Sequence, residues 1–255
     1  MIMAVNVKWI AVALPILTLR VGLTVRVGLT LGVGLTICVG LTLFACSAKK
    51  PEQPASATAA ADPAPHSDAA SPSDPRPIIV AFGDSLTAGY GVEPGKSYPD
   101  DLQRLIDAAG YKYHVVNMGV SGDTTTDGIQ RLAEVVEAKP AIVILEFGGN
   151  DGLRGLPVST TRINLIQMVQ ALQKAGIQIL LAGMSLPRNY GPDYIHSFEQ
   201  VYIDVAAQFH LARIPFLLEG VGGHPELLQS DGIHPTAQGC EIVSSNVLKY
   251  LKVLL

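Results

Sequence analysis

The chain has 255 residues, of which 48% are hydrophobic, and it carries 18 basic against 22 acidic residues. This length suits one folded domain with room for an appendage. The acidic excess argues against a nucleic-acid partner, which would require a basic face.

Residues 1–46 form an apolar segment without Asp or Glu and with three basic residues, Lys8, Arg20 and Arg26. A basic start followed by an uncharged apolar run is typical of an export signal. The run ends in Leu43-Phe44-Ala45-Cys46, which resembles a bacterial lipobox, in which the cysteine is lipidated and becomes the new N-terminus. We therefore expect an exported bacterial protein, periplasmic or anchored to a membrane by lipid on Cys46. The alternative is an uncleaved anchor helix, because about 20 apolar residues can span a bilayer.

Residues 47–76 are rich in Pro, Ala, Ser and Asp and show no apolar periodicity. Such a segment buries too little surface to offset its ordering entropy, so a flexible tether is expected. Three of the 18 basic residues lie in the signal, so 15 basic and 22 acidic residues remain after it, a net charge near −7. Of the three cysteines only Cys240 falls in the expected folded domain, residues 77–255, which excludes a disulfide within that domain.

From residue 77 onward, short apolar runs alternate with amphipathic stretches. The runs predict strands at residues 78–82, 113–116, 141–147, 177–184 and, more weakly, 211–217. The stretches between and after them predict helices at 97–109, 125–138, 158–175, 193–209 and 236–254. Strands that are apolar throughout, each followed by a helix, indicate a parallel sheet covered on both faces. The sequence thus predicts an α/β fold, a three-layer α/β/α sandwich with a five-stranded parallel sheet.

Four polar, glycine-rich segments stand out, and three of them directly follow a predicted strand. They are Gly83-Asp84-Ser85-Leu86, Val120-Ser121-Gly122-Asp123-Thr124, Gly148-Gly149-Asn150-Asp151-Gly152 and Asp231-Gly232-Ile233-His234-Pro235. Ligands of open α/β sheets bind beyond the carboxyl ends of the strands. We therefore expect these segments to gather at one edge of the sheet.

The segments contain what a hydroxyl nucleophile needs: a base, a group that orients the base, and donors for an oxyanion. Ser85 is the candidate nucleophile, His234 the base and Asp231 the residue that fixes its tautomer. Gly122 offers a backbone N–H and Asn150 a side-chain amide. Taken alone, each segment also has a structural explanation, because Asp and Ser cap helices and Asn-Asp or Asp-Gly pairs shape turns.

With these motifs, residues 77–255 resemble the SGNH, or GDSL, hydrolase family. They are most similar to its bacterial branch of multifunctional thioesterase/lysophospholipase and arylesterase enzymes. The resemblance implies a flavodoxin-like fold, a catalytic triad of Ser85, His234 and Asp231, and an oxyanion hole completed by Gly122 and Asn150. It implies a serine esterase that cleaves carboxylic esters or thioesters of small-molecule or lipid substrates, with no metal or cofactor.

The acyl group is expected to contact apolar residues of two loops, at 152–157 and 186–194. The candidate substrate-binding residues are Leu153, Leu156, Pro187 and Tyr190. Two alternatives remain at this point. One is a deacetylase acting on envelope polysaccharide, and the other is a non-catalytic envelope lipoprotein that serves as a binding module.

Overall fold

The computed structural model describes residues 74–255. The expected export signal, the lipidation site at Cys46 and residues 47–73 of the expected tether lie outside the described residues. Of the tether, only residues 74–76 are described, and there Arg76 forms ion pairs with Asp74 and with Asp107.

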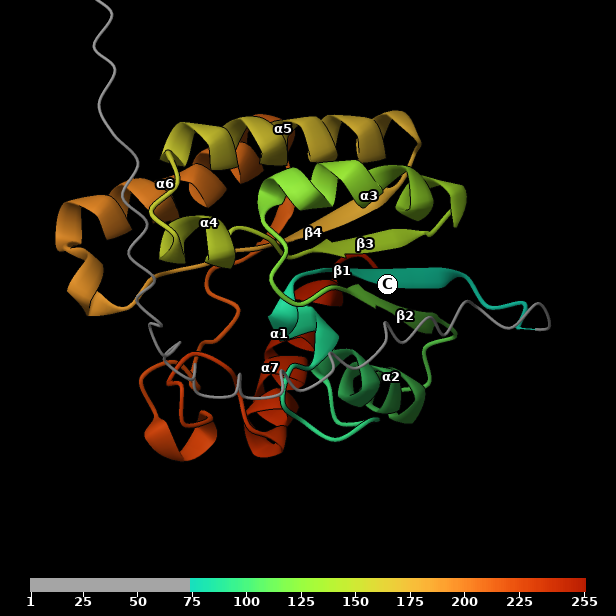
Figure 1. Cartoon of the computed structure of the whole chain (residues 1–255). Helices are drawn as coiled ribbons and strands as arrows, with labels where there is room; N and C mark the ends of the chain where they lie inside the picture. The colour runs from blue at the N-terminus through green and yellow to red at the C-terminus, as the bar shows by residue number, and fades with distance from the viewer. Residues whose placement is uncertain (1–73) are drawn as a thin grey trace, which may run out of the picture. The chain divides into compact units, whose positions relative to one another are not determined.

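A five-stranded sheet forms the centre of the domain, and all its strand pairs are parallel (Figure 1). Its strands are β1 (Ile78–Gly83), β2 (His114–Gly119), β3 (Ile142–Leu145), β4 (Gln178–Ala182) and β5 (Ala212–Ile214). Their order across the sheet is β2-β1-β3-β4-β5. The chain therefore leaves β1 on one side to form β2 and returns on the other side to form β3. This reversal opens a crevice at the carboxyl ends of β1 and β3, where such sheets bind ligands.

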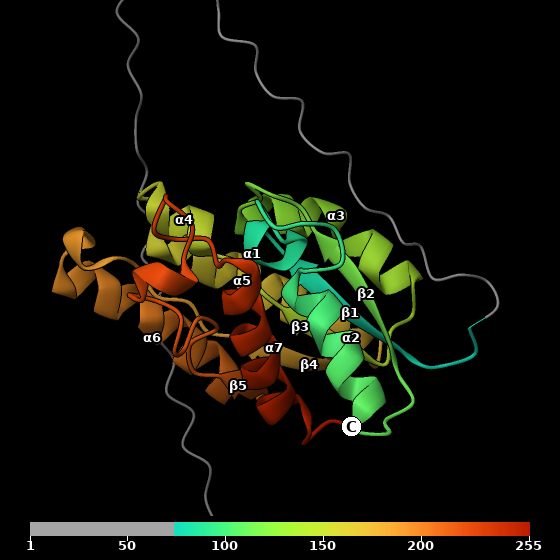
Figure 2. The same cartoon turned by 90° about the horizontal axis from the view of Figure 1, so that it is seen from below.

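Helices cover both faces of the sheet, as Figures 1 and 2 show. On one face lie α3 (Thr125–Glu137), α5 (Val158–Lys174) and α6 (Pro192–Phe209), and on the other α2 (Tyr98–Ala108) and α7 (Ala237–Leu251). The apolar residues of β1 and β3 are almost wholly buried between these layers. The predicted three-layer α/β/α sandwich is confirmed.

Local sequence explains where the helices begin. Ser97 caps α2 and Thr124 caps α3, and each forms a capping box with the aspartate three residues later, Asp100 and Asp127. A capping box satisfies two backbone N–H groups that the first turn leaves free. The ends of all five long helices lie within three residues of the predicted ends.

Four short helical segments were not predicted. They are α1 (Ser85–Ala88), α4 (Gly149–Leu153), η1 (Arg188–Tyr190) and η2 (Pro225–Leu227). Strand β2 also extends to Gly119 rather than ending at Val116, because its pairing with β1 continues as far as Gly83. Because α1 and α4 directly follow β1 and β3, they place Ser85 and Asn150 at the crevice.

None of the helices within residues 74–255 combines the length and the hydropathy needed to cross a bilayer.

Candidate active site

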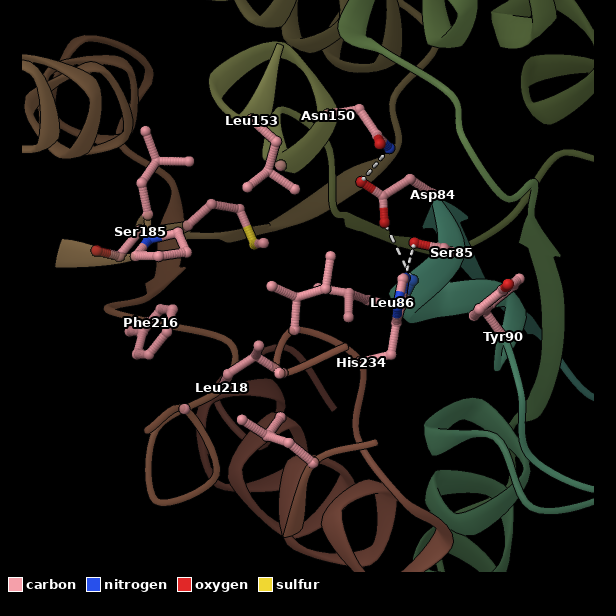
Figure 3. A pocket seen from close by; sticks show the side chains of 18 of the residues that line it. Asp84, Ser85, Leu86, Tyr90, Asn150, Leu153, Ser185, Phe216, Leu218 and His234 are labelled. Carbon is pink, nitrogen blue, oxygen red and sulfur yellow. Dashed lines mark hydrogen bonds between the residues drawn. The ribbon is translucent and has the colours of Figure 1, made fainter. Parts of the chain in front are cut away.

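Ser85, His234 and Asp231 form a continuous hydrogen-bonded chain at the carboxyl edge of the sheet. Figure 3 shows the Ser85 and His234 side chains of this chain. The Oγ atom of Ser85 lies 2.8 Å from Nε2 of His234. The Nδ1 atom of the same imidazole lies 2.7 Å from Oδ2 of Asp231. With Nδ1 protonated toward the carboxylate, Nε2 is free to accept the serine proton, which is the arrangement of a nucleophile, a base and an orienting acid.

The turn at Asp231 fixes both the carboxylate and the imidazole. Gly232 adopts φ +74°, which reverses the chain so that Asp231 and His234 face each other. Oδ1 of Asp231 also accepts the backbone N–H groups of Ile233 and His234, over 3.0 and 3.1 Å. Burial raises the pKa of Asp231, but these N–H groups and the imidazole outweigh it and hold the pKa below its usual range. The carboxyl is therefore an anion at neutral pH.

Ser85 is the first residue of α1, and Asp84 caps that helix by accepting the Leu86 N–H over 3.0 Å. Of the two residues that could cap α1, Asp84 is therefore the one that does so. The Ser85 side chain is left free to point at His234. Gly122 lies across the crevice with φ +88°, a left-handed conformation that favours glycine. Within residues 74–255, the N–H groups of Ser85 and Gly122 donate to no protein acceptor. They are available for an oxyanion.

The Asn150 amide lies between these two elements and is held by the protein. Its Nδ2 atom donates to the Asp123 carbonyl over 2.8 Å and to Oδ2 of Asp84 over 3.2 Å. Asp123 is fixed in turn by Arg131, whose Nε lies 2.8 Å from its carboxylate. The structure therefore brings Asn150 together with Ser85 and Gly122 around one end of the cavity that contains the Ser85 hydroxyl.

A buried carboxyl pair, Asp84 and Glu146, lies directly behind Ser85. The two residues are 2% and 0% exposed. Glu146 accepts the Asp84 N–H over 3.0 Å and the Thr87 hydroxyl over 2.9 Å. Burial, together with the neighbouring Asp84 charge, raises the pKa of Glu146 well above its usual range, and burial raises the pKa of Asp84 to about 6. As the pH rises, Asp84 is therefore the first of the pair to ionise, and Glu146 keeps its proton to higher pH.

An apolar cavity of about 680 Å³ extends from the Ser85 hydroxyl. Of the four predicted substrate-binding residues, Leu153 and Pro187 line it, as does Leu186 from the predicted loop 186–194. The other apolar residues of the lining were missed by the sequence reasoning: Leu86, Met184, Ile195, Phe216, Leu218, Leu228 and Ile233. Leu156 and Tyr190, the other two predicted substrate-binding residues, are not among the residues that line the cavity. The chain turns away after α4, and Tyr190 uses its hydroxyl to hold the Leu153 carbonyl over 2.8 Å. Tyr190 supports a cavity residue rather than contacting the cavity.

One signal could have revealed the missed Glu146. It is a lone carboxylate inside the apolar run Ile142-Val143-Ile144-Leu145-Glu146-Phe147. Asp151, which sequence reasoning placed in a structural role, is buried and accepts the Thr125 N–H over 2.9 Å. Within residues 74–255, no group of three or more His, Cys, Asp or Glu side chains is arranged to hold a metal ion.

Comparison with known proteins agrees with this geometry. The model of the GDSL-like lipase/acylhydrolase family matches residues 81–242. Esterase TesA of Pseudomonas aeruginosa is 44% identical over 69% of this chain and 89% of its own. Thioesterase 1/protease 1/lysophospholipase L1 of Escherichia coli is 35% identical over 69% of this chain and 84% of its own. Arylesterase of Vibrio mimicus is 34% identical over 68% of this chain and 89% of its own.

Solved structures give the same result. The crystal structure of TesA matches with a TM-score of 0.68 and 44% identity, over 70% of this chain and 99% of that one. The SGNH-hydrolase family esterase AlinE4 matches with a TM-score of 0.60 and 42% identity, over 71% of this chain and 97% of that one. The chain therefore belongs to the GDSL-like lipase/acylhydrolase family and is a serine-dependent ester hydrolase.

Proposed function

We propose that Ser85, His234 and Asp231 are the catalytic triad of an esterase that cleaves carboxylic esters or thioesters with an apolar acyl chain. The observation that carries the proposal is the 2.8 Å contact between Ser85 Oγ and His234 Nε2, with Asp231 on the other ring nitrogen.

In the first half of the reaction, His234 Nε2 takes the Ser85 proton while Oγ attacks the substrate carbonyl carbon. The carbonyl oxygen becomes an oxyanion, which the N–H groups of Ser85 and Gly122 and the amide of Asn150 stabilise. The carbonyl then re-forms, the bond to the leaving alcohol or thiol breaks, and His234 returns the proton to that group. Ser85 is left as an acyl ester.

In the second half, water takes the place of the leaving group. His234 accepts a proton from the water, whose oxygen attacks the acyl carbon in the same oxyanion site. The bond between the acyl carbon and Ser85 Oγ then breaks, and Oγ receives the proton from His234. This step releases the carboxylic acid and restores the Ser85 hydroxyl. In both halves the imidazolium is paired with the Asp231 carboxylate.

The size and lining of the cavity favour a substrate with an apolar acyl chain. Apolar side chains are the largest group among the residues that line its 680 Å³, and an acetyl group would fill only a small part of this volume. The names of the relatives, arylesterase and thioesterase/lysophospholipase, agree with an aromatic or fatty ester. The rival proposal is a polysaccharide deacetylase. A series of p-nitrophenyl esters from acetate to decanoate, compared with acetylated xylan, separates the two, since only the first proposal expects a preference for the longer acyl chains.

Labelling with a fluorophosphonate probe tests the triad. The wild type should be labelled and Ser85→Ala should not, while Ser85→Ala keeps its unfolding temperature and loses ester turnover. Ser197 is a matched control, because its hydroxyl lies exposed on α6 and bonds to the Asp193 carbonyl. Ser197→Ala should label and turn over substrate like the wild type. Substantial turnover by Ser85→Ala would refute the assignment.

We further propose that residues 1–46 direct export and that Cys46 receives a lipid anchor, on the composition of that segment alone. Trp9 is the chain's one tryptophan, so the processed protein should lose tryptophan fluorescence. Labelling of cells with an alkyne fatty acid should mark the wild type and Cys38→Ala but leave Cys46→Ala unmarked. Equal labelling of the two variants would exclude the anchor.

A further inference from the structure

An exposed aromatic ring packs against the imidazole of the proposed base. Tyr90 is 49% exposed, yet its ring centroid lies 4.6 Å from that of His234, with 42° between the two planes. Figure 3 shows Tyr90 beside Ser85 and His234 at one end of the cavity, with Phe216 and Ser185 at the other end. The Tyr90 hydroxyl forms no hydrogen bond with any residue in the range 74–255, so its contribution there comes from the ring.

The helix that presents Ser85 also presents Tyr90. Helix α1 ends at Ala88 and is capped by Gly89, whose φ of +78° turns the chain back. The Tyr90 N–H then donates to the Ser85 carbonyl over 3.0 Å. The proposed nucleophile and the ring that covers its base are therefore fixed in the same short turn.

Gln229 ties this turn to the loop that carries His234. Its Nε2 atom donates to the Tyr90 carbonyl over 2.7 Å and to the Pro235 carbonyl over 2.9 Å. Its backbone N–H donates to the His234 carbonyl over 2.7 Å. Gly91 makes room for this contact, because a Cβ atom there would lie 2.1 Å from the Gln229 side-chain oxygen. Gln229 thus joins the backbone at Tyr90 to the backbone at His234 and Pro235, although these two segments are far apart in the sequence.

We propose that Tyr90, held in place by Gln229, is a positioning residue for His234. The ring keeps the imidazole in line between Asp231 and Ser85, and its face stabilises the imidazolium that forms in each half of the reaction. The other charged groups that face this imidazole are the carboxylates of Asp231, on the same loop, and Asp84, at the start of α1. The inference assumes that His234 is the base, as proposed above.

Two substitutions at Tyr90 separate the ring from the hydroxyl. Tyr90→Phe keeps the ring and should retain wild-type kcat on p-nitrophenyl acetate, whose small acyl group makes few contacts with the cavity. Tyr90→Leu keeps an apolar side chain without a ring and should lower kcat about three- to tenfold with little change in KM. Without the ring, the imidazolium is less stable, so the acid limb of the kcat/KM profile should move to lower pH by about half a unit. Asp84 titrates in the same range in every variant, so the comparison is with the wild-type profile.

Gln229→Met keeps the length of the side chain but removes the donor, and it should shift the profile in the same direction by a smaller amount. The double variant Tyr90→Leu/Gln229→Met should be no worse than Tyr90→Leu, because both changes act through one ring. Additive losses, or equal losses in Tyr90→Phe and Tyr90→Leu, would overturn the proposal. A rise in KM with unchanged kcat and pH profile would overturn it too, since Tyr90 would then contact only the substrate.

Fluorophosphonate labelling keeps this test distinct from the test of the triad. If Ser85→Ala is inactive and unlabelled while Tyr90→Leu behaves like the wild type, only the role of Tyr90 fails. If Ser85→Ala remains active, the triad assignment itself fails. Because the Tyr90 side chain is half exposed, Tyr90→Leu should keep the wild-type unfolding temperature.

Discussion

Asn150 donates its side-chain amide to Asp84, the residue before Ser85, over 3.2 Å. The same Nδ2 atom donates over 2.8 Å to the Asp123 carbonyl, so both amide hydrogens are directed by the protein before a substrate arrives. Donors that are already oriented need no reorganisation when charge develops, which is the main source of their catalytic effect. We expect the oxyanion to accept the amide hydrogen that forms the longer bond, the one directed at Asp84.

Asn150→Ala should therefore lose about 10²–10³ in kcat with a small change in KM, since the donor acts mainly on the transition state. Steady-state kinetics on a p-nitrophenyl ester measures the loss. Asn246, which bonds to the Glu219 carbonyl on the surface, is the matched control, and Asn246→Ala should retain wild-type rates. A loss below fivefold in Asn150→Ala would remove its amide from the oxyanion hole.

Asp231→Asn should lower kcat by about 10³–10⁴, because an amide at this position can favour the wrong imidazole tautomer. The slowed rate should appear in ester turnover and also in the rate of fluorophosphonate labelling, which needs an activated Ser85. The chain offers a matched His–carboxylate pair away from the site, His224 and Glu226, 3.3 Å apart and exposed. Glu226→Gln should leave both rates unchanged. Normal labelling of Asp231→Asn would mean that the carboxylate does not orient the base.

The alternation of apolar and amphipathic runs was enough to predict the layers of the fold, because the central strands β1 and β3 are buried on both faces and the long helices bury one face each. The motif segments likewise lie together because parallel strands end at the same edge. The direction of a loop is not encoded in such a pattern. Leu153 and Leu156 are both apolar residues of one loop, yet only Leu153, the last residue of the unpredicted helix α4, lines the cavity.

Long-range pairs were also beyond sequence reasoning. The pKa of Glu146 is raised because the side chain is buried against Asp84, which lies 62 residues away. The Tyr90 ring contacts His234 directly, and Gln229, which is 139 residues from Tyr90, binds both the Tyr90 carbonyl and the Pro235 carbonyl. In the sequence, each of these residues lies in a turn or at the end of a strand and gives no sign of its distant partner. These contacts form only because segments that are far apart in the sequence meet at the carboxyl edge of the sheet.

The buried pair should make stability depend on pH. Asp84 and Glu146 have raised pKa values, so between about pH 4 and the folded-state pKa values the folded protein binds more protons than the unfolded chain. Their contribution to the free energy of unfolding is therefore fully present below about pH 4. It is lost as the pH rises through those folded-state pKa values, with Asp84 near 6.

Glu146→Gln removes one of these titrations and keeps the side-chain shape. The amide oxygen can accept the Asp84 and Thr87 donors, and the amide nitrogen can donate to the Asp84 carboxylate. Relative to the wild type, the variant should gain stability as the pH rises from 4.5 to 7.5, by about 1.4 kcal/mol for each pH unit over which Glu146 holds its proton in the folded protein but not in the unfolded chain. Urea denaturation at the two pH values measures the gain. Glu226→Gln, at an exposed carboxyl whose pKa is lowered, should show no such gain. A constant difference between wild type and Glu146→Gln would mean that Glu146 ionises normally.

Leu153 and Leu156 provide a test of the acyl cavity within one loop. Leu153 lines the cavity, whereas Leu156 lies outside it with its carbonyl bonded to the Tyr194 hydroxyl over 3.2 Å. Leu153→Trp should fill part of the space that a long acyl chain needs while sparing the Ser85 hydroxyl and its oxyanion donors. We expect kcat/KM for p-nitrophenyl decanoate to fall at least about tenfold relative to that for the acetate, a typical size for steric discrimination in an apolar pocket. Leu156→Trp should leave the ratio of the two esters unchanged. If both variants change the ratio equally, the acyl chain does not occupy this cavity, and if neither does, it enters from another side of Ser85.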